Sequence, residues 1–233
     1  MLFDFWSANN YYHWLIDALP RLLMILKEFN NSNYTLVLPK KASRFVNDTL
    51  RLYNVTNISF IENDTYLSNA NILMPDYAAG SGHIHPTFVN EVRRKLMESV
   101  AGTGKHERIY VSRSKQKARR IVNEAEVIEI LKQHNFQILY FENLSFEEQV
   151  LLVKNARYYV SSHGANMTNL MFMKDEAGVL ELIREDSPNF CYWALSDVCK
   201  MNYYYQLCAI AEKDHLFVNL SELKENLKLL LNE

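Results

Sequence analysis

The sequence predicts an α/β protein of two domains, each with a parallel β-sheet covered by helices. Short apolar runs of strand length alternate with longer segments in which apolar residues recur every three or four positions. Such alternation is typical of parallel sheets with helices on both faces. A loop at 75–86 with two glycines and two prolines interrupts the alternation, and the flexible stretch 102–104 follows a helix expected at 87–100. We therefore expect an N-terminal domain over residues 1–100 and a C-terminal domain over 101–233.

The first domain opens with a long helix. Apolar side chains from Trp14 to Leu26 recur at helical spacing, which predicts a helix over 11–29, and Pro20 predicts a kink or a break inside it. Further along, the pattern predicts strands at 34–39, 58–61 and 71–74 and a helix at 42–53. This domain is the less complete of the two.

The second domain shows the clearer alternation. Its strands are expected at 108–112, 136–141, 157–161, 178–183 and 203–209. Its helices are expected at 123–134, 145–155, 166–173, 188–200 and 221–231. Asn143 or Ser145, followed by Glu147 and Glu148, is a helix-start signature that places acidic residues at the positive end of the helix dipole.

Composition and charge exclude several classes of protein. The chain has 233 residues, 48% of them hydrophobic and 22% charged, which is ordinary for a globular protein. The formal net charge of −2 provides no global field for nucleic acid, so we expect no nucleic-acid partner. No apolar run approaches the roughly 20 residues of a membrane span. Peripheral membrane association and the oligomeric state stay open.

The three cysteines are Cys191, Cys199 and Cys208. They are odd in number and lack the spacing of a zinc site, so neither a disulfide framework nor a structural metal is indicated. A reduced, cytoplasmic compartment fits best.

The most informative stretch is Ser161-Ser162-His163-Gly164-Ala165-Asn166-Met167-Thr168-Asn169. It follows a predicted buried strand, turns at Gly164 and opens a helix. The first N–H groups of that helix would be unpaired and available to an anion, with His163, Ala165 and Asn166 beside them. The alternative is a packed structural histidine.

A second strand, at 108–112, is followed by a basic loop at 113–120. Guanidinium groups clamp phosphate oxygens bidentately, so Arg113, Arg119 and Arg120 are candidates to hold a diphosphate. The lysines of the loop would simply be solvated. On the alternative interpretation, the whole basic loop is solvated and binds no ligand. Two cationic strand ends in one α/β unit indicate a phosphate-bearing ligand.

Three further residues are candidates for chemistry. His13 and Asp17 are four positions apart and therefore share a helix face, where the carboxylate could orient the imidazole as a general base. A structural hydrogen bond between them is the alternative. Glu181 lies in an apolar strand and could accept hydrogen bonds from ribose hydroxyls; an exposed edge glutamate is the equally weighted alternative.

Missing motifs narrow the choice. The sequence has no Asp-x-Asp, so a metal-chelated diphosphate is not expected. It also lacks G-x-G-x-x-G after a strand, G-x-x-x-x-G-K-S/T and G-x-S-x-G, the motifs of dinucleotide oxidoreductases, P-loop NTPases and α/β-hydrolases. Binding of a nucleotide diphosphate by arginines and a helix N-terminus, with no metal site and no cofactor, is what remains.

Four sequence blocks occur in one order between residue 10 and about residue 183. They read NYYHWLIDALPRL at 10–22, RIYVSR and RRIVNE at 108–113 and 119–124, ENLSFEEQ at 142–149 and SHGANMTN at 162–169. In these blocks the chain resembles glycosyltransferase family 61.

The resemblance implies a GT-B architecture, with two Rossmann-like domains facing across a cleft. It implies an inverting, metal-independent transfer from a nucleotide sugar, usually UDP-linked, to a carbohydrate acceptor. His13 and Asp17 would supply the base from the acceptor-side N-terminal domain. The implied donor-binding residues of the C-terminal domain are Arg113, Arg119, Arg120, Asn123, His163, Gly164, Ala165, Asn166 and Glu181.

Two details go with this resemblance. The composition favours a bacterial-type member that takes part in surface or capsular polysaccharide synthesis. In the family the first block usually follows a sizeable N-terminal region, and here it begins at residue 10, so the first domain is expected to lack strands. A non-catalytic module that binds a nucleotide sugar or a glycan is the alternative function, and a nucleic-acid-binding role for 113–120 is disfavoured by the net charge.

Overall fold

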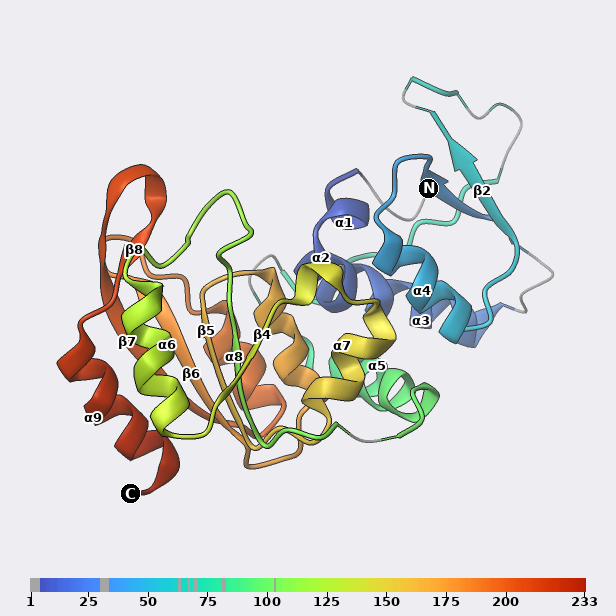
Figure 1. Cartoon of the computed structure of the whole chain (residues 1–233). Coiled ribbons are helices and arrows are strands. Elements are labelled where there is room, and N and C mark those ends of the chain that lie inside the picture. The colour runs from blue at the N-terminus through green and yellow to red at the C-terminus, as the bar shows by residue number, and fades with distance from the viewer. Residues whose placement is uncertain are drawn as a thin grey trace. The chain divides into compact units, whose positions relative to one another are not determined.

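The computed structural model describes residues 5–29, 34–62, 64–66, 68, 71–80, 83–102 and 104–233. The chain divides into two compact units, unit 1 at Met1–Ser99 and unit 2 at Val100–Glu233 (Figure 1). Both are α/β, as the alternation predicted.

Unit 1 combines helices with a small sheet. Its helices are α1 (Phe5–Asn9), α2 (Tyr11–His13), η1 (Trp14–Ala18), α3 (Leu19–Glu28), α4 (Arg44–Leu52) and α5 (Pro86–Ser99). Strands β1 (Leu36–Pro39) and β2 (Ile58–Ile61) pair in parallel, with Leu36 opposite Ile58. Trp14, Leu15, Leu19, Leu22, Leu36 and Leu38 are fully buried in its core.

The predicted first helix is present but changes type. Segment η1 is a π-helical turn, in which the N–H of Leu19 donates to the carbonyl of Trp14 five residues back. Pro20 follows at the start of α3 and has no N–H to continue the ordinary four-residue pattern. The wider turn therefore accommodates the proline without ending the helix, and π-turns of this kind are frequent at functional sites.

The strand predicted at 71–74 is wrong. Residues 71–77 have no regular structure, and Ile72, Leu73 and Met74 are 61%, 44% and 68% exposed. The segment is held by the buried Arg21, whose Nε and Nη2 donate to the carbonyl of Pro75 at 3.1 and 2.8 Å. The guanidinium also lies 4.4 Å from the ring centre of Tyr77. This tertiary anchor, rather than a strand partner, fixes the segment.

Unit 2 is built on a six-stranded sheet in the order β4-β3-β5-β6-β7-β8. The strands are β3 (Arg108–Val111), β4 (Gln137–Leu139), β5 (Tyr158–Ser162), β6 (Gly178–Arg184), β7 (Asn202–Ile210) and β8 (Leu216–Phe217). All adjacent pairs are parallel except β7 with β8, which is antiparallel and was not predicted.

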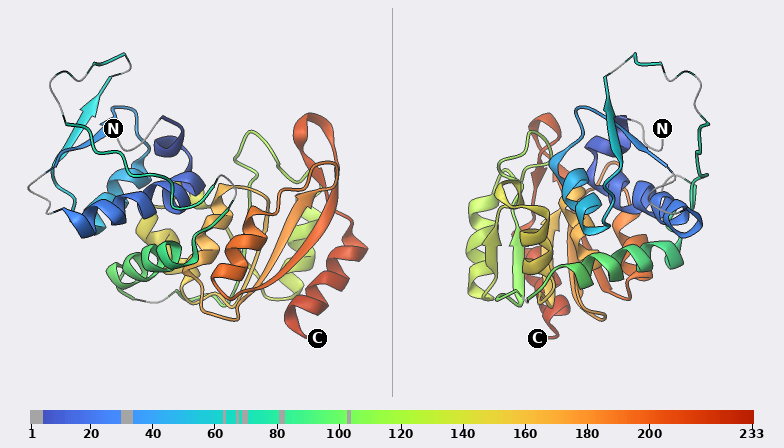
Figure 2. Two further views of the ribbon diagram at one scale, coloured as in Figure 1. Left: turned by 180° about the vertical axis from the view of Figure 1, so that it is seen from behind. Right: turned by 90° about the vertical axis from the view of Figure 1, so that its right-hand side faces the viewer.

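Helices cover both faces of this sheet (Figure 2). Helices α6 (Glu124–Gln133) and α9 (Leu220–Leu231) close one face over a core that includes Tyr110, Val160 and Leu180. The other face carries α7 (Phe146–Val153), the 3₁₀-helix η3 (Ala165–Phe172) and α8 (Cys191–Val198), with short 3₁₀ turns η2 (Phe141–Asn143) and η4 (Glu212–Asp214) in the connections. This is a Rossmann-like arrangement, and it brings the carboxyl ends of β3, β5, β6 and β7 to one edge.

Candidate functional site

The carboxyl edge of the unit 2 sheet gathers the residues predicted to bind a donor. In open parallel sheets ligands bind at this edge, because the loops that leave the strands meet there. Arg113 follows β3, His163 and Gly164 follow β5, and Glu181 lies within β6. The structure brings these four together through the contacts described below.

Arg113 lies against Gly164. A Cβ atom at position 164 would be 2.0 Å from Nη1 and 2.5 Å from Cζ of Arg113, so the guanidinium occupies the space that any side chain there would need. Nη1 donates to Oδ1 of Asn166 at 3.1 Å, and Nη2 lies 3.5 Å from the carbonyl of Ala118. Nε is buried and has no hydrogen-bond partner among the described residues. The guanidinium is thus positioned but not saturated.

Asn166 is itself fixed in orientation. Its Nδ2 donates to Oγ of Ser161 at 2.8 Å and approaches the hydroxyl of Tyr159 at 3.3 Å, while its Oδ1 accepts from Arg113. Because both ends of the amide are used, Asn166 locks Arg113 to the start of η3.

Arg119 adds a second positive charge nearby. Its φ of 56° is in the left-handed region, which costs a non-glycine residue about 1 kcal/mol or more. Oγ of Ser162 donates to its carbonyl at 3.2 Å and so ties the end of the basic loop to β5. Burial, and secondarily the charge of Arg119, lowers the pKa of Arg113. Within the described part of the chain neither arginine forms an ion pair with a carboxylate.

His163 is joined to Glu181 and, through it, to Tyr203. Nδ1 of His163 hydrogen-bonds Oε1 of Glu181, and the Tyr203 hydroxyl donates to Oε2 at 2.6 Å. Glu181 is fully buried, whereas 14% of the His163 side chain is exposed. The ring of Tyr192 lies 5.1 Å from that of His163.

The structure contradicts both roles that the sequence suggested for Glu181, an exposed edge residue and a direct partner of a ribose. The exposed edge glutamate is wrong, because the side chain is completely buried in a central strand. Direct hydrogen bonding to a ribose is wrong as well, because no part of the carboxylate reaches the surface and both oxygens already have protein partners.

Arg120 and Asn123 point to a different part of unit 2. Nη2 of Arg120 lies 3.0 Å from Nε2 of His215, just before β8. The amide of Asn123 forms two hydrogen bonds with the backbone of Val218, at 2.9 and 3.1 Å. Both side chains thus hold the β8 segment, and among the described residues no hydrogen bond or ion pair joins either of them to Arg113 or His163. Ala165, also predicted, is the first residue of η3.

The predicted pair in unit 1 is formed. Nδ1 of His13 lies 2.6 Å from Oδ2 of Asp17, and about a quarter of each side chain is exposed. Oδ1 of Asn10 caps the helix by accepting from the N–H groups of Tyr12 and His13, at 3.1 and 3.4 Å. His13 is the last residue of α2, and Asp17 lies in the π-turn η1. With Nδ1 held by the carboxylate, Nε2 is the nitrogen that a reacting hydroxyl would meet.

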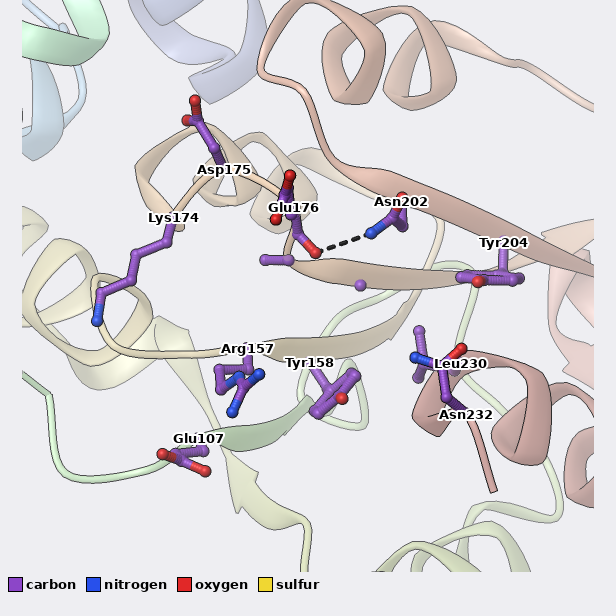
Figure 3. Close-up of a pocket in the computed structure, with 12 residues that line it drawn as sticks. Glu107, Arg157, Tyr158, Lys174, Asp175, Glu176, Asn202, Tyr204, Leu230 and Asn232 are labelled. Atoms are coloured by element: carbon purple, nitrogen blue, oxygen red, sulfur yellow. Dashed lines mark hydrogen bonds between the residues drawn. The ribbon is translucent and has the colours of Figure 1, made fainter.

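A cavity of about 540 Å³ lies at the opposite, amino-terminal edge of the unit 2 sheet (Figure 3). Arg157, Lys174 and Glu176 line it, and Nδ2 of Asn202 donates to the carbonyl of Glu176 at its rim. None of the predicted site residues lines this cavity.

In the residues that the structure describes, no three His, Cys, Asp or Glu side chains gather as the ligands of a metal ion. The helices in that same part of the chain are all too short or too polar to cross a membrane.

Sequence reasoning missed Tyr203 and Tyr192. The strand predicted at 203–209 contains Tyr203, but its hydroxyl is significant only once the register of β7 against β6 is known. In that register Glu181 is opposite Tyr205 and Val179 opposite Tyr203, which makes Tyr203 a diagonal neighbour of Glu181 on the same face.

Proteins of known function resemble parts of the chain. An EGF domain-specific O-linked N-acetylglucosamine transferase from Drosophila melanogaster is 31% identical over 97 residues, 40% of this chain and 18% of that protein. Protein O-linked-mannose beta-1,4-N-acetylglucosaminyltransferase 2 from Bos taurus is 35% identical over 117 residues, 48% of this chain and 19% of that protein. The Canis lupus familiaris protein of the same name matches to the same extent. The chain thus spans less than a fifth of the length of these relatives.

A family described as Glycosyltransferase 61 has a sequence model that matches residues 11–180, well over half of the chain. The match includes the His13–Asp17 pair, the basic loop and the 161–169 stretch. The resemblance inferred from the four sequence blocks is therefore confirmed, and the chain belongs to the Glycosyltransferase 61 family.

Proposed function

We propose that the chain is an inverting glycosyltransferase that transfers a sugar from a UDP-linked donor to a hydroxyl group of a carbohydrate acceptor, without a required metal ion or cofactor. One observation carries the proposal: Arg113 and Arg119 gather at the carboxyl edge of the unit 2 sheet with no carboxylate partner among the described residues. Two guanidinium groups in that position suit a diphosphate. Family membership supplies the reaction class.

The donor would bind through its diphosphate. Arg113 provides a guanidinium whose protein hydrogen bonds do not use all of its N–H groups, and Arg119 adds a second cation, so together they could offset the negative charge that develops on the departing UDP. A divalent cation offsets the same negative charge in metal-dependent transferases. Because the two arginines could do so here, metal independence is part of the proposal.

The reaction would be a single displacement. His13, oriented by Asp17, takes the proton of the acceptor hydroxyl at Nε2. The acceptor oxygen bonds to the anomeric carbon as the bond from that carbon to the UDP oxygen breaks, and UDP leaves with the electron pair. Attack from the side opposite the leaving group inverts the anomeric configuration. A GT-B arrangement, which is also part of the proposal, would bring unit 1 to the donor.

The relatives suggest where to begin with substrates. Their names specify N-acetylglucosamine transfer, one on EGF domains and one on protein O-linked mannose. UDP-N-acetylglucosamine is therefore the first donor to test, with a glycan or a glycoprotein as acceptor. The bacterial capsular role and the cytoplasmic location remain predictions from the sequence.

Calorimetric titration with UDP in EDTA tests the donor site. Arg113→Ala and Arg119→Ala should each weaken UDP binding by about tenfold or more, since each removes charge-assisted hydrogen bonds. Lys115→Ala is the matched control, because it removes the same charge from the same loop but its Nζ lies over the ring of Tyr140 at 4.6 Å. It should change the affinity less than about fivefold. Equal losses in all three variants would contradict a defined site.

A transfer assay with UDP-N-acetylglucosamine and a panel of glycan acceptors follows. Product formed by the wild type and lost in His13→Ala, with UDP binding retained, supports the proposed reaction. UDP binding with neither transfer nor hydrolysis would support the alternative, a non-catalytic nucleotide-sugar-binding module.

A further inference from the structure

Glu181 places a carboxylate inside a sheet that is otherwise apolar at that point. Its relative exposure is 0%, and it lies in the middle of β6 between Leu180 and Leu182, both also fully buried. An ionised carboxylate in such a position is costly unless hydrogen bonds and an opposite charge compensate it. Its two oxygens have separate partners, His163 on one side and Tyr203 on the other.

We propose that Tyr203 and Glu181 are positioning residues, which hold His163 so that its Nε2 is presented to the donor diphosphate. This inference rests on the proposed function, because it concerns the same donor site. Neither Tyr203 nor Glu181 would touch the ligand; both would act through His163.

Tyr203 is the donor that fixes the carboxylate. Burial, and secondarily the charge of Glu181, raises the pKa of Tyr203 well above its usual value. The phenol therefore keeps its proton and donates a hydrogen bond to Oε2. Its ring stacks on that of Tyr205, with the centres 6.4 Å apart. The hydroxyl therefore orients Glu181 so that Oε1 faces the imidazole.

Glu181 in turn selects the tautomer of His163. A carboxylate only accepts hydrogen bonds, so the nitrogen beside it, Nδ1, must carry a proton. Nε2 is then the ring nitrogen left for a ligand, and it has no hydrogen bond to any described residue. When Nε2 also carries a proton it can donate to a phosphate oxygen, with the positive charge of the ring balanced by Glu181. The ring of Tyr192 also packs against the imidazole, with the ring centres 5.1 Å apart.

A double-mutant cycle on UDP affinity tests this chain of contacts. Tyr203→Phe, which keeps the ring and removes only the hydroxyl, should weaken UDP binding by about fivefold. In a His163→Ala background the same change should leave the affinity unchanged, because the residue through which it acts is gone. Tyr205→Phe is the matched control on the same strand and face, and it should have no effect in either background. Equal losses with and without His163 would overturn the inference, as would no loss from Tyr203→Phe.

A ligand-free readout separates this inference from the proposed function. Long-range ¹H–¹⁵N NMR of the imidazoles, with His163 assigned through His163→Gln, should show a proton on Nδ1 in the wild type. Tyr203→Phe should shift the His163 ring signals, and Tyr205→Phe should not. If the wild type fails to bind UDP while these signals behave as expected, the proposed function fails and the positioning of His163 stands. A proton on Nε2 alone, or no shift in Tyr203→Phe, overturns the positioning itself.

Discussion

Gly164→Ala removes no charged group and yet should weaken donor binding almost as much as the loss of Arg113. The new Cβ would lie 2.0 Å from Nη1, 2.5 Å from Cζ and 2.9 Å from Nε of Arg113. Non-bonded heavy atoms need about 3.5 Å, so the guanidinium must move by about 1.5 Å. That displacement is enough to break the 3.1 Å hydrogen bond to Asn166.

The expected cost follows from the bonds that depend on this position. Hydrogen bonds to a charged group contribute about 1.5–3 kcal/mol each, so misplacing the guanidinium should raise the Kd for UDP by about 10- to 150-fold. Folding should be little affected, because φ at Gly164 is 170°, an extended value that alanine also adopts, and the Arg113 side chain can swing away.

Calorimetric titration with UDP measures the affinity, and urea unfolding measures the stability of the same samples. Gly80→Ala is the control, because the nearest atom to its new Cβ is 3.8 Å away, an ordinary contact. In an Arg113→Ala background Gly164→Ala should cost little further, since the three atoms nearest to the new Cβ all belong to the Arg113 guanidinium. Wild-type affinity in Gly164→Ala would refute the reasoning that Arg113 binds UDP from its place over Gly164.

Four further outcomes are expected. His13→Ala should reduce transfer by about 100-fold or more in a UDP-sugar assay while leaving UDP affinity unchanged, and retained transfer would exclude it as the base. Thr49→Val should lower the free energy of unfolding in urea by about 1–3 kcal/mol, because it removes Oγ1 of Thr49, which accepts from the buried Nε1–H of Trp14 at 2.8 Å; an unchanged midpoint would contradict this. Burial raises the pKa of the Cys191 and Cys208 thiols to about 12, so both should resist iodoacetamide at pH 8 in the native protein and react in urea, as read by mass spectrometry. An unfolded cysteine releases its proton near pH 8.5, about its usual pKa, whereas the native thiols keep theirs. These two groups should therefore make the free energy of unfolding fall as the pH rises from about 8.5 toward 12. A free energy of unfolding that increased over that range would contradict the burial effect.

The central strands β3, β5 and β6 of unit 2 could be predicted because they are buried on both faces. Val179, Leu180, Leu182 and Ile183 have 1% exposure or less, and a continuous apolar run of that length has few alternatives to a central strand. The run at 71–74 has a similar composition but is fixed by Arg21 from a distant helix, a contact that no local pattern records. The two-residue strand β8 is too short to leave a pattern at all.

The candidate site shows the same division between local and distant contacts. His13 and Asp17 are one helical turn apart, so their contact follows from spacing alone. Arg113 and Gly164 are far apart in the sequence, and their packing depends on which strands are neighbours. The burial of Glu181 and its bond to Tyr203 depend further on the register of β6 with β7, which is why a carboxylate expected to meet a ribose lies beneath the site instead.

The proposed function depends above all on the binding of a nucleotide diphosphate by arginines at the carboxyl edge of the unit 2 sheet. Titration of the purified chain with UDP, GDP and CMP, each with and without EDTA, tests it most directly. UDP is expected to bind with the same affinity whether or not EDTA is present, and Arg113→Ala is expected to weaken this binding. Failure of all three nucleotides to bind, or UDP binding that disappears in EDTA, would contradict it.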